Sequence, residues 1–145
     1  MNTNKNLTNT EKLAVLCAQA AEDKLAENIV LLDLSEIKIA SSNYLVICNC
    51  SSTTQVKTVA DNILDETTKH KLKKPKVEGL ENSEWVILDY FDVVVHVFID
   101  EQRAFYKLEK LWADANFYSV DDEAKLIETQ YENIKLELEK IENEI

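Results

Sequence analysis

Residues 84–98 are the most apolar stretch of the chain and read EWVILDYFDVVVHVF. Two runs of β-branched and aromatic residues, 85–88 and 93–98, flank a polar corner containing Asp89 and Asp92. This pattern predicts two strands joined by a tight turn. Strands that are apolar on both faces must be covered on both, so these two belong inside a layered domain. A Trp, a His and two Asp exceed what a core strand needs, and we expect part of this surface to bind a partner.

Two helices and three strands are predicted before this stretch. Thr8 and Glu11 have the spacing of a capping box at the start of the first helix. Ser51 or Ser52 can cap the second helix. Apolar residues recur on one face of each helix, as expected for helices that lie on a sheet. The strands are expected at 29–34, 44–48 and 76–78, and the inward residues of the second helix are Val56, Val59, Ala60, Ile63 and possibly Leu64.

A third helix is predicted to follow the apolar stretch. Asp100 suits its N-cap, and the helical spacing continues to about Trp112. Phe105, Leu108, and Leu111 or Trp112 are expected to face inward. The order of elements is then helix, strand, strand, helix, three strands and helix. This order predicts an α/β layered domain with a mixed β-sheet flanked by helices.

The last 25 residues have a different pattern. Apolar residues recur there at alternating steps of three and four, which predicts a helix with a heptad seam. An isolated helix of this length is marginal in water, so the seam should pack either on a second copy, giving a possible homodimer, or on its own domain. The seam residues are Ala124, Ile127, Tyr131, Ile134, Leu138, Ile141 and Ile145.

Composition limits the class of protein. A chain of 145 residues suits one domain with an appendage. It has no apolar run near the ~20 residues of a membrane span and no apolar signal core at residues 1–6, so a cytoplasmic location is expected. The net charge is −11, of which residues 121–145 contribute −6, so general nucleic-acid binding is disfavoured and docking on a basic protein is favoured. Three cysteines in apolar patterns indicate reduced, buried thiols.

Few residues of the chain could carry catalysis. Gly79 is the only glycine, which excludes glycine-rich phosphate-binding loops at the motif level. Asp89, Asp92 and His96 could hold a divalent ion and serve a transferase or phosphohydrolase. The alternative is structural, with the carboxylates shaping a turn and the histidine bonding within the sheet. We expect no cofactor, no metal and no enzyme activity.

Two further features each allow two interpretations. The lysine-rich segment 69–76 could contact RNA phosphates, or it could be a solvated helix end that complements the helix dipole. Trp85 could be a core residue, or an interface anchor worth ~2 to 4 kcal/mol. Trp112, at the end of an amphipathic helix, is expected in the core. Cys48 and Cys50 fall on one face of a strand, a geometry compatible with a metal pair but weak without a second pair.

Residues 77–79, 85–98 and 105–112 resemble the ribosomal silencing factor family, also called Iojap-like proteins. Upstream segments at 31–34, 43–47 and 55–61 are similar to it as well, so the resemblance runs from about residue 13 to residue 113. On this basis residues 1–118 are expected to form the family domain and residues 119–145 an acidic C-terminal helical extension. The family's fold is similar to that of nucleotidyltransferases, but residues 49–52 lack the Gly-Ser pair and the spaced carboxylates that those enzymes use.

The resemblance implies a translational repressor. Members of the family bind a basic protein on the intersubunit face of the large ribosomal subunit, the fourteenth in the usual numbering. Occupying that face blocks the small subunit from joining and lowers translation when nutrients are limiting. The resemblance implies these partner-binding residues in this chain: Glu78, Trp85, Asp89, Tyr90, Asp92 and His96.

Three positions depart from the family pattern. Phe91 stands where a glycine is common at the hairpin tip, Asn43 where an aspartate is usual, and Cys50 where a glycine is common. A phenylalanine cannot adopt a positive φ as cheaply as glycine. We expect altered turn geometry there, and an exposed Phe91 could add apolar contact to the partner.

Overall fold

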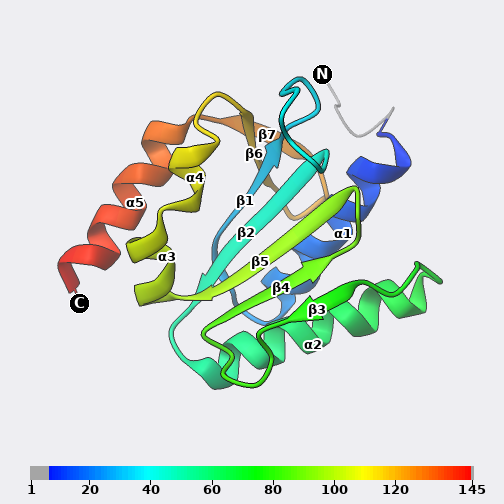
Figure 1. Ribbon diagram of the computed structural model, residues 1–145, viewed down its shortest axis with the longest axis horizontal. Helices are drawn as coiled ribbons and strands as arrows, with labels where there is room; N and C mark the ends of the chain where they lie inside the picture. Colours follow the sequence, from blue (N-terminus) through cyan, green and yellow to red (C-terminus); the bar gives the residue numbers. More distant parts are fainter. Residues whose placement is uncertain (1–6, 145) are drawn as a thin grey trace.

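The computed structural model describes residues 7–144 and has one mixed sheet of seven strands in the order β3-β4-β5-β2-β1-β6-β7 (Figure 1). Strands β2 and β5 are parallel, and every other neighbouring pair is antiparallel. The predicted α/β layered fold with a mixed sheet is confirmed. The elements are α1 (Asn9–Asp23), β1 (Glu27–Asp33), β2 (Tyr44–Cys50), α2 (Thr53–Lys69), β3 (Lys76–Glu78), β4 (Trp85–Asp89), β5 (Val93–Ile99), α3 (Asp100–Tyr106), α4 (Leu108–Leu111), β6 (Asn116–Val120), β7 (Leu126–Thr129) and α5 (Tyr131–Glu144).

The two faces of the sheet are covered to different extents. Helices α1 and α2 lie behind the sheet in Figure 1, whereas α3, α4 and α5 lie beside β1 and β2, toward the β6 side. The larger core cluster joins α1 and α2 to inward strand residues such as Val46, Val95 and Val97. The smaller cluster joins Leu32 and Phe117 to residues of α4 and α5. Because side chains alternate along each strand, the strands contribute residues to two cores, one on each face of the sheet, as predicted for strands that are apolar on both faces.

Local signals explain where the first two helices begin. The Thr8 hydroxyl accepts from the Glu11 amide at 3.1 Å, and the Glu11 carboxylate accepts from the Thr8 amide at 2.9 Å, so the predicted capping box is confirmed. Ser52 caps α2 by accepting from the Gln55 amide. No helix of residues 7–144 is both long and apolar enough to cross a membrane.

The three cysteines are buried thiols in the cluster between the sheet and α1 and α2. Burial raises the pKa of Cys17, and it raises the pKa of Cys48 and of Cys50 to about 12. Because the thiolate is the nucleophile and the metal ligand, these groups are poorly suited to either role.

The prediction of one continuous third helix is wrong. Helix α3 ends at Tyr106 because Lys107 adopts a left-handed backbone with φ 50°, and α4 begins directly after it. Ile99, not Asp100, occupies the N-cap position, and the Asp100 carboxylate instead accepts from the Asn49 side chain at 2.7 Å. Phe105, predicted inward, is 77% exposed. Of the two alternatives Leu111 and Trp112, Leu111 is 75% exposed and Trp112 packs against the smaller core cluster.

A buried ion pair accounts for this break. The Nε of Arg103 donates to Glu109 Oε1 at 2.7 Å, and both side chains are fully buried. The Arg103 Nη1 also donates to the Asn28 carbonyl at 2.6 Å and to Asn49 Oδ1 at 2.8 Å. A straight helix places residues six apart on different faces, so the kink at Lys107 lets Glu109 reach the guanidinium.

The prediction of a helix from residue 121 onward is also wrong for its first part. Residues 116–129 form the β6–β7 hairpin, which extends the sheet beyond β1. The Asp121 carboxylate accepts from the amides of Glu123 and Lys125, and Ala124 takes φ 65°, so a tight turn replaces a helical turn here. The expected domain boundary at residue 118 falls within β6.

Helix α5 carries the rest of the predicted seam. Tyr131 and Ile134 pack on the cluster containing Phe117, and Leu138 is buried. The seam of this helix therefore packs on its own domain. Ile145, the last seam residue, lies outside the described residues.

Removing either member of the buried ion pair should destabilise the fold strongly. We expect Arg103→Met and Glu109→Gln each to lower the free energy of unfolding by about 3 to 5 kcal/mol, because an uncompensated charge stays buried. The double variant Arg103→Met/Glu109→Gln should lose much less free energy of unfolding than the sum of the two single losses, as measured by urea unfolding.

The exposed pair Lys140 and Glu137, 3.2 Å apart, is the matched control. The same cycle there should change the free energy of unfolding by less than about 0.5 kcal/mol per substitution. Additive losses at Arg103 and Glu109 would contradict the assignment of a coupled pair.

Candidate partner-binding face

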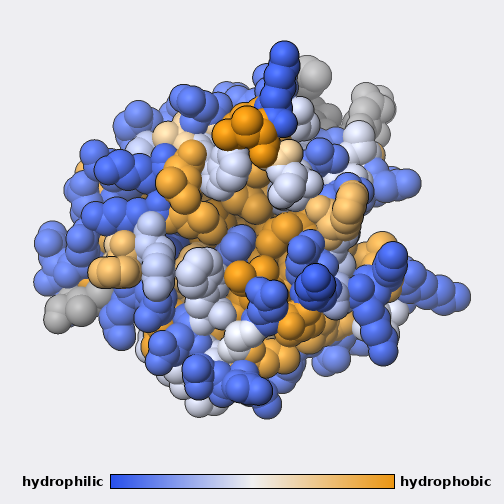
Figure 2. Space-filling view, in the orientation of Figure 1, coloured by the Kyte–Doolittle hydropathy of each residue, from blue (hydrophilic) through white to orange (hydrophobic). Residues whose placement is uncertain are grey.

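One part of the sheet lacks a helical cover on the side opposite α1 and α2. This part is formed by β3, β4 and β5, and Figure 2 shows hydrophobic side chains gathered near its centre with hydrophilic ones around the rim. We call it the open face. Val77, Val86, Leu88, Val95 and Val97 pack toward the helices, so the alternate residues of the same strands face outward. The open face consists of Lys76, Glu78, Trp85, Ile87, Asp89, Val94 and His96.

Trp85 lies half-buried at the edge of the open face, within a set of aromatic rings. Its ring stacks on Phe98 with centroids 4.7 Å apart and lies 5.0 Å from the ring of Tyr106. The indole Nε1 donates to His96 Nδ1 at 3.0 Å. Gly79 allows the chain to pass close by, because a Cβ there would lie 2.1 Å from the Trp85 carbonyl oxygen. The indole is therefore fixed from below and from one side.

His96 is the polar residue at the centre of the open face. In the sheet register it lies between Ile47 of β2 and Ile87 of β4, and its side chain is only 9% exposed. Burial lowers the pKa of His96 to about 4, while the negative charge of Asp89 acts in the opposite direction. The imidazole is therefore neutral near pH 7.

The structure brings four of the six predicted residues together. Trp85, Asp89 and His96 share one face of β4 and β5. Glu78 joins them from β3, where it pairs in register with Ile87, and its side chain is exposed. Two carboxylates and an indole thus border an apolar centre.

Tyr90 and Asp92 lie outside this group. The Tyr90 hydroxyl is 2.8 Å from Thr67 Oγ1 of α2, so the ring turns toward the helices, and burial raises the pKa of Tyr90 to about 12. The Asp92 carbonyl accepts from the amides of Asn43 and Tyr44, which ties the β4–β5 turn to the start of β2. These two residues are placed to support the turn beside the open face.

The structure gives no support to the alternative of a metal-dependent transferase or phosphohydrolase. Asp89 Oδ1 accepts from the Phe91 amide at 2.8 Å, as in the turn-shaping interpretation. Within residues 7–144 no group of three or more His, Cys, Asp or Glu is arranged to hold a metal ion, so Asp89, Asp92 and His96 do not form one.

Several exposed apolar residues differ from the sequence-based expectations: Phe105 was expected to face inward, and Tyr106 and Ile39 were not singled out. Phe105 and Tyr106 make an edge-on ring pair at the end of α3, and Tyr106 reaches Trp85. Ile39, in the loop between β1 and β2, is 88% exposed. Phe91 is 78% exposed, and it adopts φ 79°, the positive φ that was expected to be unfavourable for a phenylalanine. A helix break at Lys107 would have indicated that Tyr106 lies beside Trp85. The spacing of apolar residues in the sequence does not indicate this break.

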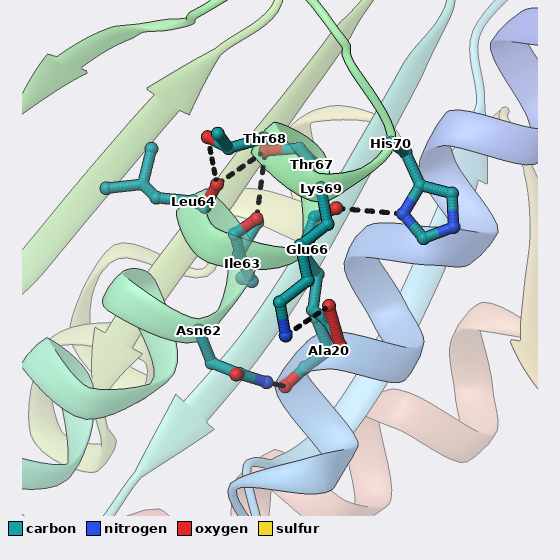
Figure 3. Close-up of polar contacts among 9 residues, drawn as sticks. All are labelled: Ala20, Asn62, Ile63, Leu64, Glu66, Thr67, Thr68, Lys69 and His70. Carbon is teal, nitrogen blue, oxygen red and sulfur yellow. Dashed lines mark hydrogen bonds and ion pairs between the residues drawn. The ribbon is translucent and has the colours of Figure 1, made fainter.

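The lysine-rich segment begins at the end of α2, in the helix layer. Figure 3 shows His70 Nδ1 next to the Glu66 carbonyl, 2.9 Å away, and Lys69 paired with the Glu66 carboxylate at 3.5 Å. Asn62 on the same helix donates to the Ala20 carbonyl and holds α2 against α1. The solvated helix-end interpretation fits these contacts, since a cation near the last carbonyls complements the dipole.

The neutral state of His96 should make folding stability sensitive to acid. The unfolded imidazole takes up a proton near its ordinary pKa of 6.5, whereas the folded one does so only near 4, so stability falls as the pH drops through this window. Between pH ~6.5 and ~5 the wild-type chain should lose about 2 kcal/mol more than His96→Gln. Urea unfolding of both chains at each pH measures this difference. An equal loss in the two chains would contradict the prediction.

The chain matches the family model described as "Ribosomal silencing factor during starvation" over residues 7–143. It is 38% identical to the ribosomal silencing factor RsfS of Bacillus subtilis over 113 residues, which cover 78% of this chain and 95% of that protein. It is 32% identical to the chloroplastic protein Iojap of Zea mays over 70% of this chain and 44% of that one. A crystal structure of a protein from Chromobacterium violaceum superposes with a TM-score of 0.69 at 30% identity, covering 72% of this chain and 87% of that chain. The family model and these relatives show that this chain belongs to the ribosomal silencing factor family.

Proposed function

We propose that this chain represses translation by binding the fourteenth protein of the large ribosomal subunit, a basic protein on the intersubunit face. Occupation of that face would block joining of the small subunit, as a response to limiting nutrients in the cytoplasm. The observation that carries the proposal is the open face, where a half-buried Trp85 borders an apolar centre. A fixed aromatic ring beside uncovered apolar surface is the usual form of an interface anchor.

The charge of the open face fits a basic partner. Glu78 and Asp89 lie on it with one cation, Lys76, so the face is acidic by one charge, and the chain as a whole carries a net charge of −11. Complementary charge speeds encounter and sets orientation more than it adds affinity. A patch of ~800 Å² per partner is enough for a specific interface, so a chain of this size can act by steric exclusion, without catalysis.

The proposal uses one copy of the chain. A homodimer through the C-terminal seam stays a prediction, and the seam residues Tyr131, Ile134 and Leu138 are already packed within the monomer. Light scattering of the full chain measures its molar mass, and the mass of one chain would end the idea of a homodimer.

Trp85→Ala should weaken binding to purified large subunits by at least about 30-fold, because an interface anchor of this type contributes ~2 kcal/mol or more. Binding is measured by co-sedimentation, and subunit joining by the yield of full ribosomes after small subunits are added. The variant should restore joining that the wild-type chain blocks.

Tyr118→Ala is the matched control for Trp85→Ala. Tyr118 is also a half-buried aromatic residue, but it packs on the helix side of the sheet. This variant should bind and inhibit like the wild-type chain, provided that both variants are folded by circular dichroism. Equal binding by Trp85→Ala and the wild-type chain would contradict the proposed site.

Phe91→Gly should raise the stability of the fold and at the same time weaken binding to the partner. Phe91 has φ 79°, which costs a residue with a side chain about 1 kcal/mol, so glycine should raise the free energy of unfolding by roughly that amount. The same change removes an exposed ring and should weaken binding to large subunits several-fold. Undiminished affinity would show that the Phe91 ring makes no contact with the partner.

A further inference from the structure

The hydrogen bond between Trp85 and His96 determines the tautomer of the imidazole. An indole N–H can only donate, and it points at His96 Nδ1 from 3.0 Å. His96 Nδ1 must therefore be the unprotonated, accepting nitrogen. The ring is neutral, because burial lowers the pKa of His96 to about 4. The single ring proton is then on Nε2.

The Nε2 atom has no partner within the described chain. None of the hydrogen bonds found among residues 7–144 involves it, and it is not among the completely buried unpaired atoms, which are Arg103 Nη2 and Glu109 Oε2. Its partners in the sheet register, Ile47 and Ile87 on the adjacent strands, are apolar, and the charged group that acts on the ring is the Asp89 carboxylate, with which it makes no hydrogen bond in the described chain. Water can satisfy this donor only while the open face is uncovered.

A partner that covers the open face must replace that water. A donor buried without an acceptor costs more than a hydrogen bond gains, so the partner needs an acceptor opposite Nε2. Lysine and arginine side chains cannot accept. A carboxylate is disfavoured, because Glu78 and Asp89 outnumber Lys76, the cation among the open-face residues, and leave this face negative. Neutral carbonyl and hydroxyl oxygens remain, and carbonyls are the more numerous, because every residue of the partner's main chain carries one.

We propose that the His96 Nε2–H donates to a carbonyl oxygen of the partner protein at the centre of the open face, with Trp85 holding the ring in the donating tautomer. This inference rests on the proposed function for the existence of the partner. It assigns His96 a role in specificity, since a surface without an acceptor at that point is penalised.

The tautomer is tested on the free protein, without ribosomes. A long-range ¹H–¹⁵N spectrum near pH 7 distinguishes a protonated from an unprotonated ring nitrogen. We expect protonated Nε2 and unprotonated Nδ1 for His96, and a mixture of tautomers in Trp85→Phe, which lacks the indole donor. A charged ring, or a proton on Nδ1 in the wild-type chain, overturns the inference whatever the ribosome does.

The contact with the partner is tested with two substitutions. The side chain of Asn is short and can keep an acceptor near the Nδ1 position, whereas that of Gln can place an amide donor near the Nε2 position. We expect His96→Asn to bind large subunits about tenfold more weakly than His96→Gln. Unfolding curves for both variants confirm that each is folded under the assay conditions.

The outcomes separate this inference from the proposed function. Equal affinity of His96→Asn and the wild-type chain overturns the donor role while the proposed function stands. Failure of the wild-type chain to bind large subunits overturns the proposed function and the partner contact together, and the spectrum still decides the tautomer.

Discussion

The buried pair of Arg103 and Glu109 is the interaction on which the arrangement of the molecule depends. Its guanidinium reaches the Asn28 carbonyl of β1 and the Asn49 side chain of β2, and Glu109 brings in α4. Asn49 in turn holds the first residue of α3, Asp100. A charge buried without these partners would cost several kcal/mol, so α3 has one allowed direction as it leaves β5. That direction places Tyr106 against the indole of Trp85.

The sheet is covered unequally, and this asymmetry connects the fold to the proposed function. Helices α4 and α5 pack over the β1 and β6 side through Trp112, Tyr131 and Ile134, whereas β3, β4 and β5 have helices on one side only. An apolar surface left uncovered costs stability unless something else covers it. The retention of such a surface next to a rigid Trp85 is the physical reason to assign it to a partner.

Much of this fold could be predicted from local patterns. Strands β1, β2, β4 and β5 follow from runs of β-branched residues, and the starts of α1 and α2 follow from hydroxyl caps, because both signals act within a few residues. The break between α3 and α4 could not, because Arg103 and Glu109 look like solvent-facing residues of an amphipathic helix. Their burial depends on Asn28 and Asn49, which are distant in sequence.

The C-terminal hairpin and the site show the same limit. Spacings of three and four residues at Ala124 and Ile127 agree with a helix, but the turn at Asp121 and pairing with β6 outweigh them. For the site, strict alternation along β4 and β5 places Trp85, Asp89 and His96 on one side. Alternation also places Tyr90 with Val86 and Leu88 on the helix side, where its ring meets α2, so the partner-binding role that the resemblance implies for Tyr90 does not follow from the strand pattern.

The hairpin of β6 and β7 also affects how this protein behaves at high concentration. Without it, the long apolar strand β1 would lie at the border of the sheet, with free amides and carbonyls ready to pair with another molecule. With it, the two borders are β3 and β7, only three and four residues long, and Pro75 immediately before β3 has no amide proton to offer. Polymerisation through strand pairing is thereby discouraged. The open face can then stay exposed to solvent for the proposed partner while strand pairing between copies of the chain is suppressed.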